Sequence, residues 1–265
     1  MVKMDAAAVE VVDRTNYIAK SRASMEALKS ANLLKSVSIN ALILGEKGVG
    51  KETLARHIID APLVEATLFN ELLTLIETNA SVIVKNFHLI TNYKKLKIAL
   101  ETHKTRIIAT SSAPLSEALM DEFFSLKITI PPLREREEDV EPLIEKFAFE
   151  AYVMFGESRS TPFSLKDIIA DVSQNCYSLR RSVYNAYLMS GFGEKEILSM
   201  MEQFLSHRIG GRNDYRDLLY LFDVPLIKSG HAKFGSQLAM SEKFGLNRNT
   251  LRKKINDYKD KLDFE

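Results

Sequence analysis

Near the start of the chain the sequence reads Asn40-Ala41-Leu42-Ile43-Leu44-Gly45-Glu46-Lys47-Gly48-Val49-Gly50-Lys51-Glu52-Thr53. A short apolar run, typical of a buried strand, leads into a glycine-rich loop, and helical spacing resumes at Leu54 and Ile58. A phosphate-binding loop requires this order of strand, loop and helix, whereas a glycine turn without a ligand is the alternative. The glycines let backbone N–H groups turn toward phosphate oxygens, and Lys51 can reach the β- and γ-phosphates. The predicted nucleotide-binding residues are Gly45, Glu46, Lys47, Gly48, Val49, Gly50, Lys51, Glu52 and Thr53.

Strands and helices alternate on both sides of this loop. Apolar, β-rich runs follow at Ser81 to Val84, Arg106 to Ala109 and Leu126 to Ile130, and Tyr93 to Leu100 has helical spacing. Met25, Leu28, Ala31 and Leu34 predict a further helix before the first strand. The alternation predicts an α/β domain whose parallel sheet is covered on both faces.

Pro131-Pro132 ends this alternation, and the rest of the chain has helical periods only. Four helices are predicted before residue 210, at Val140 to Met154, Leu165 to Gln174, Leu179 to Met189 and Glu194 to Leu205. The glycine-rich, polar run Gly210-Gly211-Arg212-Asn213-Asp214 is the predicted linker after them. We therefore expect an α/β nucleotide-binding domain at 1–135, a helical lid at 136–209 and a third domain at 210–265.

The third domain contains the run Gly245-Leu246-Asn247-Arg248-Asn249-Thr250-Leu251-Arg252-Lys253-Lys254-Ile255. Leu251 and Ile255 are four residues apart and would face a core together, so the cations project toward a phosphate-lined groove. Gln237 to Phe244 predicts a short preceding helix, with Gly245 in the turn. This is the order of a helix-turn-helix, although a basic amphipathic helix can also be a plain solvated surface. The predicted DNA-binding residues are Asn247, Arg248, Asn249, Thr250, Arg252, Lys253 and Lys254.

Composition excludes several classes of protein. With 265 residues and 46% apolar residues, the chain can form two or three globular units. Its net charge of +1 predicts no affinity for polyanions, so any binding of nucleic acid has to come from the local basic cluster. The single cysteine rules out an internal disulfide, and no apolar run resembles a membrane span or a signal peptide, so we expect a cytoplasmic protein without a membrane partner. The five histidines share no ligand spacing and no nucleophile elbow occurs, so no metal site and no catalytic residue are predicted.

Four strings resemble motifs of the NtrC-like family of bacterial enhancer-binding proteins. GSQLAMSEKFGLNRNTLRKKI is similar to the Fis-type DNA-binding domain that ends the family, and GEKGVGKE to its Walker A loop. Ser21 to Lys29 resembles its lead-in helix, and Pro131 to Asp139 its PPLRER-x-ED motif. The resemblance runs from about Tyr17 to Tyr258 and implies an AAA+-type parallel sheet with a helical lid, followed by an all-α Fis-type helix-turn-helix domain. It also implies that ATP or ADP is bound and that Arg180 contacts its phosphates from the lid.

The sequence departs from the family at the residues that hydrolyse ATP. The family has an Asp-Glu pair at the end of its third strand, whereas this chain has Lys85-Asn86, which places a positive charge where the metal ion belongs. No arginine occurs between Arg106 and Arg134 to serve as an arginine finger, and Ala109-Thr110-Ser111-Ser112 lacks the sensor asparagine. We therefore expect nucleotide binding without turnover, with a role for Mg²⁺ left open, and no enzyme activity.

A further departure concerns partners. The GAFTGA loop with which the family engages the sigma-54 polymerase has no counterpart between Leu54 and Ala80, and the α/β unit begins too early to leave room for a receiver domain. We expect a DNA-binding transcriptional regulator that does not activate the sigma-54 polymerase, with RNA polymerase or a regulatory protein as a further partner. A weak ATPase completed by a partner in a mixed ring, and a protein-interaction module, are the alternatives.

The spacing of apolar residues in the third domain also predicts a homodimer. Five residues have the spacing of a helix that buries one face against a symmetry mate, namely Leu218, Leu219, Phe222, Leu226 and Ile227. Two recognition helices would then lie about 34 Å apart, so the expected target is double-stranded DNA with an inverted repeat.

Overall fold

The structure, a computed structural model, describes residues 17–156 and 168–262. These belong to two compact units, Met1–Gly193 and Glu194–Glu265. Among the described helices, none combines the length and the apolar character needed to cross a lipid bilayer.

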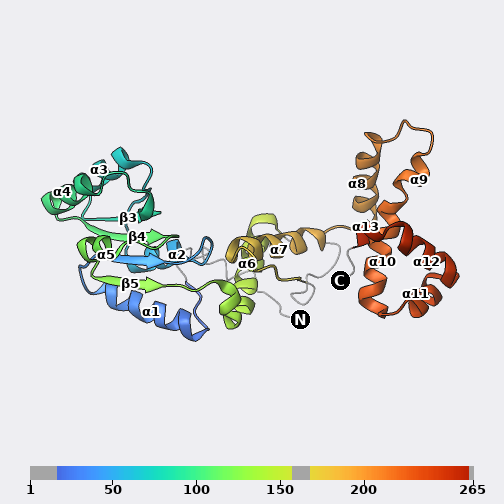
Figure 1. Ribbon diagram of the computed structural model, residues 1–265, viewed down its shortest axis with the longest axis horizontal. Helices are drawn as coiled ribbons and strands as arrows, with labels where there is room; N and C mark the ends of the chain where they lie inside the picture. Colours follow the sequence, from blue (N-terminus) through green and yellow to red (C-terminus); the bar gives the residue numbers. More distant parts are fainter. Residues whose placement is uncertain (1–16, 157–167, 263–265) are drawn as a thin grey trace. The chain divides into compact units, whose positions relative to one another are not determined.

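A parallel five-stranded sheet forms the centre of the first unit (Figure 1). Its strands are β1 (Ala41–Leu44), β2 (Leu63–Glu65), β3 (Ser81–Lys85), β4 (Arg106–Ser111) and β5 (Leu126–Thr129). They lie in the order β2-β3-β4-β1-β5, with Leu42 paired with Ala109 on one side and with Lys127 on the other. The prediction of a parallel sheet is confirmed, and the loop after β1 leaves the sheet between two neighbouring strands.

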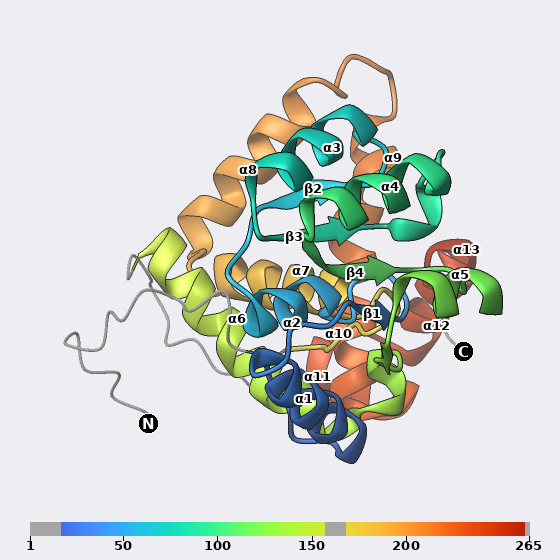
Figure 2. The ribbon, with the colours of Figure 1, turned by 90° about the vertical axis from the view of Figure 1, so that its left-hand side faces the viewer.

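Helices cover both faces of the sheet (Figure 2). Because side chains alternate along a strand, Leu42 packs on one face, whereas Ala41 and Ile43 pack on the other. The first face is covered by α3 (Phe69–Thr78), α4 (Tyr93–His103) and α5 (Glu117–Phe123), and the second by α1 (Arg22–Lys35) and α2 (Lys51–Ile58). The expectation that both faces are covered is therefore confirmed.

Two elements, β2 and α3, lie in a stretch for which the sequence predicted none. β2 has only three residues, too few to show a period of two. Its backbone pairs with β3, Val64 opposite Val84. α3 then returns over the first face, with Leu72 and Ile76 buried beneath it. These elements place Glu65 at the end of β2, beside the end of β3.

The lid of the first unit is built on α6 (Val140–Phe155) and α7 (Cys176–Met189), which pack Leu143 and Phe147 against Leu179 and Val183. The helix predicted at Leu165 to Gln174 is wrong over its described part, because residues 168–172 have no regular structure and residues 173–175 form a turn. Residues 165–167 lie outside the described ranges.

Local side-chain hydrogen bonds explain this irregular segment. The Ser178 hydroxyl donates to the Asp171 carbonyl at 2.8 Å and accepts from the Gln174 N–H at 2.9 Å. Ser173 N–H donates to Asp171 Oδ1 at 2.9 Å, and Asn175 has φ +55°. Such side-chain hydrogen bonds compete with the backbone hydrogen bonds of a helix. The positive φ of Asn175 also prevents helical backbone from continuing through this residue into α7.

A buried ionic cluster joins α1 to the segment that leads into the lid. Asp139 is fully buried and accepts from the backbone N–H groups of Lys20 (2.6 Å) and Ser21 (2.8 Å), from the Ser21 and Ser24 hydroxyls, and from Arg136 Nη1 at 3.1 Å. Burial alone would raise the pKa of Asp139, but these hydrogen bonds, from Ser24 above all, hold it below its usual range. Arg136 is also buried and reaches the loop after β1 through its second amino group.

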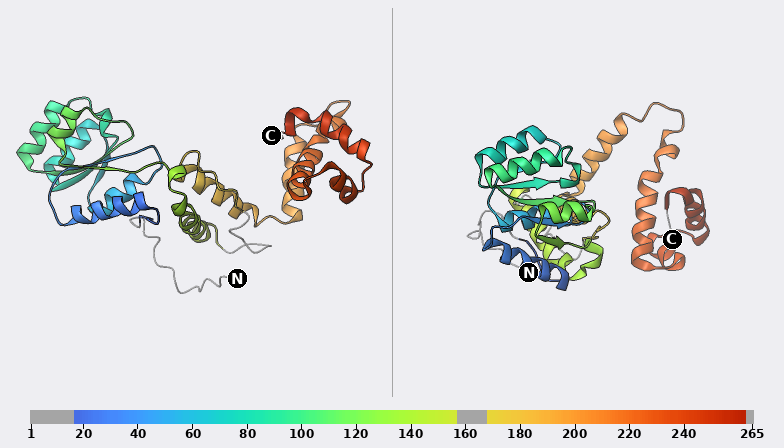
Figure 3. Two further views of the ribbon diagram at one scale, coloured as in Figure 1. Left: turned by 60° about the horizontal axis from the view of Figure 1, so that its bottom comes forward. Right: turned by 60° about the vertical axis from the view of Figure 1, so that its left-hand side comes forward.

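The second unit is entirely helical in its described part (Figure 3). It contains α8 (Glu194–Ser206), α9 (Asp214–Leu218), α10 (Tyr220–Phe234), α11 (Gln237–Phe244), α12 (Arg248–Asp257) and α13 (Lys259–Leu262). Ile227, Met240, Leu251 and Leu262 form its core. The unit begins at Glu194, whereas the sequence placed the predicted helix 194–205 in the lid. α8 has no buried residue.

Gly230 sets the distance between α10 and α11. A Cβ at this position would lie 2.3 Å from Phe244 Cζ, well inside van der Waals contact. We expect Gly230→Ala to lower the free energy of unfolding of the second unit by up to about 2 kcal/mol, since overpacking costs ~1–3 kcal/mol and the gain in helix propensity offsets ~1 kcal/mol of it. Urea unfolding of the full chain measures this. Ser229→Ala, at the exposed neighbouring position, is the control; equal stability of the two variants would contradict the packing argument.

Candidate nucleotide and DNA sites

The loop between β1 and α2 has all of its carbonyl groups held in place. The carbonyl oxygens from Gly45 to Val49 each accept a hydrogen bond from a side chain or from the lid. The donors are Lys51 Nζ to Gly45 and Glu46 at 2.6 Å each, Asn175 Nδ2 to Lys47 at 2.9 Å, the Cys176 N–H to Gly48 at 3.1 Å, and Arg136 Nη2 to Val49 at 3.2 Å.

The N–H groups of the same loop have the opposite environment. In a planar trans peptide the C=O and N–H bonds point to opposite sides, so fixing the carbonyls on one side leaves the N–H groups on the other. From Glu46 to Lys51 no backbone N–H donates to an acceptor in the described part of the protein. Gly48 and Gly50 have φ +81° and +99°, backbone conformations that allow neighbouring N–H groups to face one anion. Together with the N-terminus of α2, they form a cradle for an anion such as a phosphate.

Lys51 lies at the edge of this cradle with its position fixed. Its side chain is buried, and its three ammonium protons are shared among the Gly45 and Glu46 carbonyls and the Ser112 hydroxyl, which lies 3.2 Å away. Burial lowers the pKa of Lys51 to about 8, with Glu46 opposing this shift and Lys47 adding to it. Lys51 is therefore charged at neutral pH, and a bound phosphate would stabilise that charge. Ser112 carried no predicted role, because only the fold brings the end of β4 to this lysine.

The lid lies directly on the loop. A Cβ at Gly48 would lie 2.8 Å from the Gln174 carbonyl oxygen and 2.9 Å from Tyr177 Cδ2, so only glycine fits there. Arg134 donates to both carboxylate oxygens of Glu46, at 3.1 and 2.8 Å, and holds the pKa of that carboxyl below its usual range. Asn175 Nδ2 adds a contact to Glu46 Oε2 at 3.2 Å. Glu46 therefore secures the lid, whereas the backbone around it forms the cradle.

Lys85 ends β3 and Asn86 follows it, at the positions where the resemblance places the Asp-Glu pair of the NtrC-like family. Lys85 Nζ lies 2.8 Å from Glu65 Oε1 and 3.3 Å from Glu52 Oε2, and Asn86 Nδ2 donates to Glu65 Oε2 at 2.8 Å. The hydrogen bond to Glu65 is the main reason why the pKa of Lys85 is raised. Magnesium requires an octahedral set of oxygen ligands, mainly carboxylates, phosphates and water. It does not fit here, because an ammonium group already pairs with the two carboxylates.

Arg180 contacts another helix of the lid, and no contact between it and the loop is seen in the described residues. Arg180 lies on α7 with Nε 3.2 Å from Glu150 Oε2 and its guanidinium 4.7 Å from the centre of the Phe147 ring. Its contacts are therefore to α6, and a contact with phosphate stays a prediction. Thr53 is half-buried in the first turn of α2.

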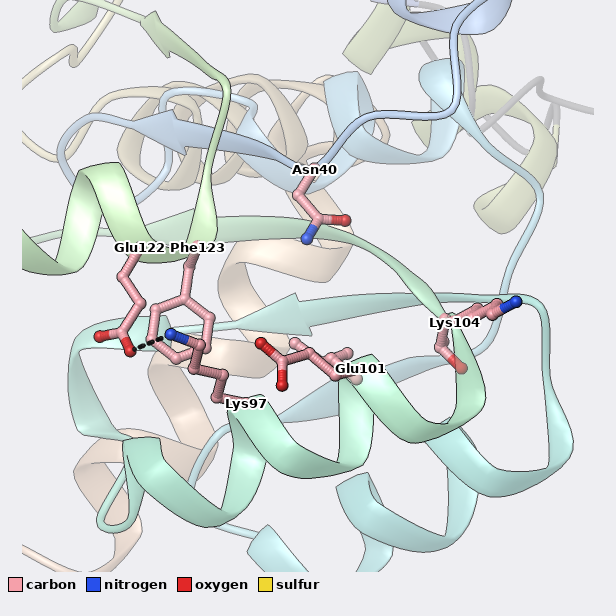
Figure 4. A pocket seen from close by; sticks show the side chains of 8 residues that line it. Asn40, Lys97, Glu101, Lys104, Glu122 and Phe123 are labelled. Carbon is pink, nitrogen blue, oxygen red and sulfur yellow. Dashed lines mark hydrogen bonds and ion pairs between the residues drawn. The ribbon is translucent and has the colours of Figure 1, made fainter.

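A small cavity of about 190 Å³ lies at the other end of the sheet (Figure 4). Asn40 and Phe123, which precede β1 and β5, line it together with the end of α4. An ion pair of 2.9 Å between Lys97 and Glu122 lies across it. Ligands of open parallel sheets bind at the carboxyl ends of the strands, so this cavity is on the wrong side for the nucleotide site.

In the second unit, α11 and α12 occupy the predicted ranges, and Gly245 between them has φ +64°. Leu251 is fully buried and fixes one face of α12 in the core. On the other face, Arg248, Asn249 and Arg252 line a groove of about 470 Å³ together with Gln237 from the start of α11. Gln237 carried no predicted role.

The remaining candidates on α12 have different positions. Thr250 and Lys253 are exposed, and Asn247 caps the helix by accepting from the Asn249 N–H at 2.9 Å. Lys254 is placed apart from the groove, because its ammonium lies 2.5 Å from Asp223 Oδ2 of α10. Tyr258 donates to the same oxygen at 3.1 Å. Lys254 follows Leu251 by three residues and so shares its inward side of the helix, where it stabilises the unit.

Comparison with known proteins adds the family context. The family model described as the Sigma-54 interaction domain matches residues 17–86. A search of curated proteins gives no match. This chain is similar in structure to NtrX from Brucella abortus in complex with ADP, with a TM-score of 0.56 and 17% identity over 92% of this chain and 69% of that chain. NtrX from the same organism in complex with ATP gives a TM-score of 0.55 and 18% identity over 91% and 69%.

These comparisons agree with the geometry at the level of the fold. The residues that match the Sigma-54 interaction domain model span α1, β1, the loop, α2, β2, α3 and β3. At this identity the NtrX structures show a shared fold and nothing finer.

Proposed function

We propose that this protein is a DNA-binding transcriptional regulator whose AAA+-like body binds ATP or ADP without hydrolysing it. The observation that carries DNA binding is the outer face of α12, where Arg248, Asn249 and Arg252 surround one groove while Leu251 anchors the helix. In a Fis-type helix-turn-helix domain, the residues at the start of such a helix contact base edges and the cations around them hold phosphates. Arg248 and Asn249 are therefore the candidates for base contacts.

The anion cradle from Glu46 to Lys51 supports nucleotide binding, and the NtrX structures contain ADP and ATP. The loss of hydrolysis is supported by Lys85, which pairs with Glu52 and Glu65 in place of a metal ion. Without metal-bound charge neutralisation or an arginine finger, the transition state of phosphoryl transfer lacks most of its stabilisation. The bound nucleotide would then act as a structural ligand between the sheet and the lid.

We propose further that the protein does not act on the sigma-54 polymerase, although residues 17–86 match the domain named for it. From the end of α2 to β3, the chain is occupied by β2 and α3, and only Ala66, Thr67 and Leu68 join these two elements. This connection is too short to carry a GAFTGA loop.

We propose a homodimer through the second unit, with α8 as its main surface. Ile227 lies in the unit's own core and so cannot serve as the predicted contact. Phe222, by contrast, is 65% exposed. On α8 the side chains of Ile197, Leu198 and Met200 are also more than half exposed. An amphipathic helix without a buried residue favours burial against a second copy.

Two substitutions on α12 test the DNA-binding proposal. Arg248→Ala is expected to relax sequence preference at a cost of about 1–3 kcal/mol at the contacted base pair. Lys253→Ala is expected to weaken binding to all sequences alike and to lower the slope of log affinity against log salt by about 1. Titration of the full protein with inverted-repeat and scrambled duplexes at several salt concentrations measures both.

Lys259→Ala on α13 is the matched control, since it removes one exposed cation outside α12 and should leave both quantities unchanged. Equal binding by wild-type protein and Arg248→Ala on every duplex would contradict the assignment of α12. Footprints on single, non-palindromic half-sites would contradict the dimer.

A further inference from the structure

His88 lies close to the phosphate cradle and had no predicted role. It belongs to the short 3-10 turn Phe87–Leu89 that follows β3, and its Nδ1 lies 2.9 Å from Ser111 Oγ at the end of β4. The next residue, Ser112, contacts Lys51 Nζ at 3.2 Å. The imidazole, two serines and the cradle's lysine therefore meet at the carboxyl end of the sheet, where ligands of such folds bind.

The hydrogen bonds of Ser111 determine which ring nitrogen carries the proton. Its hydroxyl donates to the Ala113 carbonyl at 2.5 Å, so its single proton is used. The Ser111 oxygen also accepts from the Ala113 N–H at 3.2 Å. Toward His88 it can act only as an acceptor, and His88 must donate from Nδ1. In the neutral ring Nε2 then carries the lone pair and has no acceptor or donor partner within the described residues.

Two positive charges act on this ring. Burial is the main reason why the pKa of His88 is below its ordinary value, and the ammonium groups of Lys51 on α2 and Lys47 in the loop lower it further. β4 presents the neutral Ser111, and no carboxylate in the described part of the chain opposes the two lysines. His88 is therefore neutral at physiological pH in the free protein. An anion placed among these groups reverses the balance, because it favours the imidazolium.

We propose that His88 Nε2 binds the terminal phosphate of a bound nucleotide and takes up a proton from solvent as it does so. This inference rests on the proposed nucleotide binding. A phosphate-binding loop of this kind would hold one phosphate. Lys51 contacts both the loop carbonyl of Gly45 and Ser112 at the end of β4, beside Ser111 and His88, so the next phosphate would lie on the side of His88. Protonated His88 then supplies a positive charge to a triphosphate in a site that does not fit magnesium. A diphosphate in the same cradle is too short to reach His88.

Calorimetric titration of the full protein tests this inference, with a non-hydrolysable ATP analogue and ADP as ligands between pH 5.5 and 7.5. The preference of wild-type protein for the triphosphate over the diphosphate should increase as the pH falls, by up to about tenfold for each unit by which binding raises the pKa of His88. His88→Gln should lose this increase and keep its affinity for ADP. His103→Gln, at an exposed position on α4, should behave as wild type. Taking ratios to the variant cancels the titration of the ligand itself.

Nuclear magnetic resonance of the imidazole nitrogens gives a second readout. It uses wild-type protein, so it does not depend on whether a variant folds. His88 is expected to be protonated at Nδ1 in the free protein and at both nitrogens with the triphosphate bound. Triphosphate binding with the same pH profile in wild type and His88→Gln, or an unchanged His88 resonance, overturns the role of His88 alone. Absence of any nucleotide binding by wild-type protein overturns the proposed nucleotide site and this inference with it.

Discussion

Replacement of Asp139 by asparagine is expected to lower the free energy of unfolding of the first unit by about 3–5 kcal/mol, the range for breaking a buried ion pair. Asp139 is fully buried, and all of its neighbours in the cluster are donors: two backbone N–H groups, two hydroxyls and Arg136. An asparagine would leave the buried guanidinium uncompensated, and its own NH₂ group would face donors instead of acceptors. Since this cluster joins α1 to the lid segment, its loss should also loosen the lid over the loop.

The contribution of Asp139 to the free energy of unfolding should decrease at low pH. Because the pKa of Asp139 is lowered by folding, its contribution is present above the unfolded-state pKa of ~3.9 and is lost as the pH falls through the lower folded-state value. Wild type and Asp139→Asn should therefore converge in stability below about pH 4. The chain has no tryptophan, so urea unfolding is followed by circular dichroism. Glu138→Gln removes the same charge at an exposed neighbouring position and should change little; an Asp139→Asn variant as stable as this control would contradict the role of the cluster.

The sequence predicted the sheet well because its signals are local. The apolar runs at β1, β3, β4 and β5 were located within a few residues, since a strand buried on both faces needs a nearly continuous apolar run. The phosphate-binding loop could also be predicted from the sequence, because its glycines at positive φ and the lysine at the start of α2 follow one another in the chain. Such features are set by neighbouring residues, which a single sequence contains in full.

The partners of the cradle could not be predicted, because they come from distant segments. Asn175 reaches the loop from the lid, and Glu65 reaches Lys85 from a strand too short to recognise. Neither residue has a local pattern that distinguishes it from a surface side chain. The wrongly predicted helix at Leu165 to Gln174 has a related cause, since helical spacing was present but Ser173 and Ser178 offered the backbone other partners.

On α12 the helical period predicted which apolar residues face the core, but it did not predict which cations point to solvent and which point inward. Four cations lie close together in the sequence, and Leu251 identifies the inward side. From the sequence, the Lys254 side chain could point either outward to DNA or inward. It points inward, because it forms an ion pair with Asp223 on α10. The acid that fixes this lysine lies 31 residues earlier in the chain, so only the packing of α10 against α12 reveals the pair.

Replacement of Lys51 by alanine is expected to abolish binding of ATP and ADP while leaving the fold intact. Lys51 is the buried ammonium of the cradle, and its loss removes both the charge on the phosphates and the two bonds that shape the loop at Gly45 and Glu46. In wild-type protein the contribution of Lys51 to ADP affinity should be constant up to about pH 8 and decline above it, because the free protein then loses the Lys51 proton that the bound state requires. Calorimetry with ATP and ADP measures these affinities, and Arg22→Ala, at an exposed position on α1, is the matched control.

The same measurement separates this site from an ordinary magnesium-dependent one. Because Lys85 and Arg56 together balance the charges of Glu52 and Glu65, removing divalent cations with EDTA should change the affinity of wild-type protein for ATP by less than about twofold, near the precision of the method. Lys85→Asp places three carboxylates together, so its binding of ATP should become dependent on Mg²⁺ because the repulsion then requires a cation. Wild-type protein that binds ATP only with Mg²⁺, or that releases phosphate steadily in a manner abolished by Lys51→Ala, would show that Lys85 has not replaced the metal. Binding that survives Lys51→Ala would instead place the nucleotide outside the cradle.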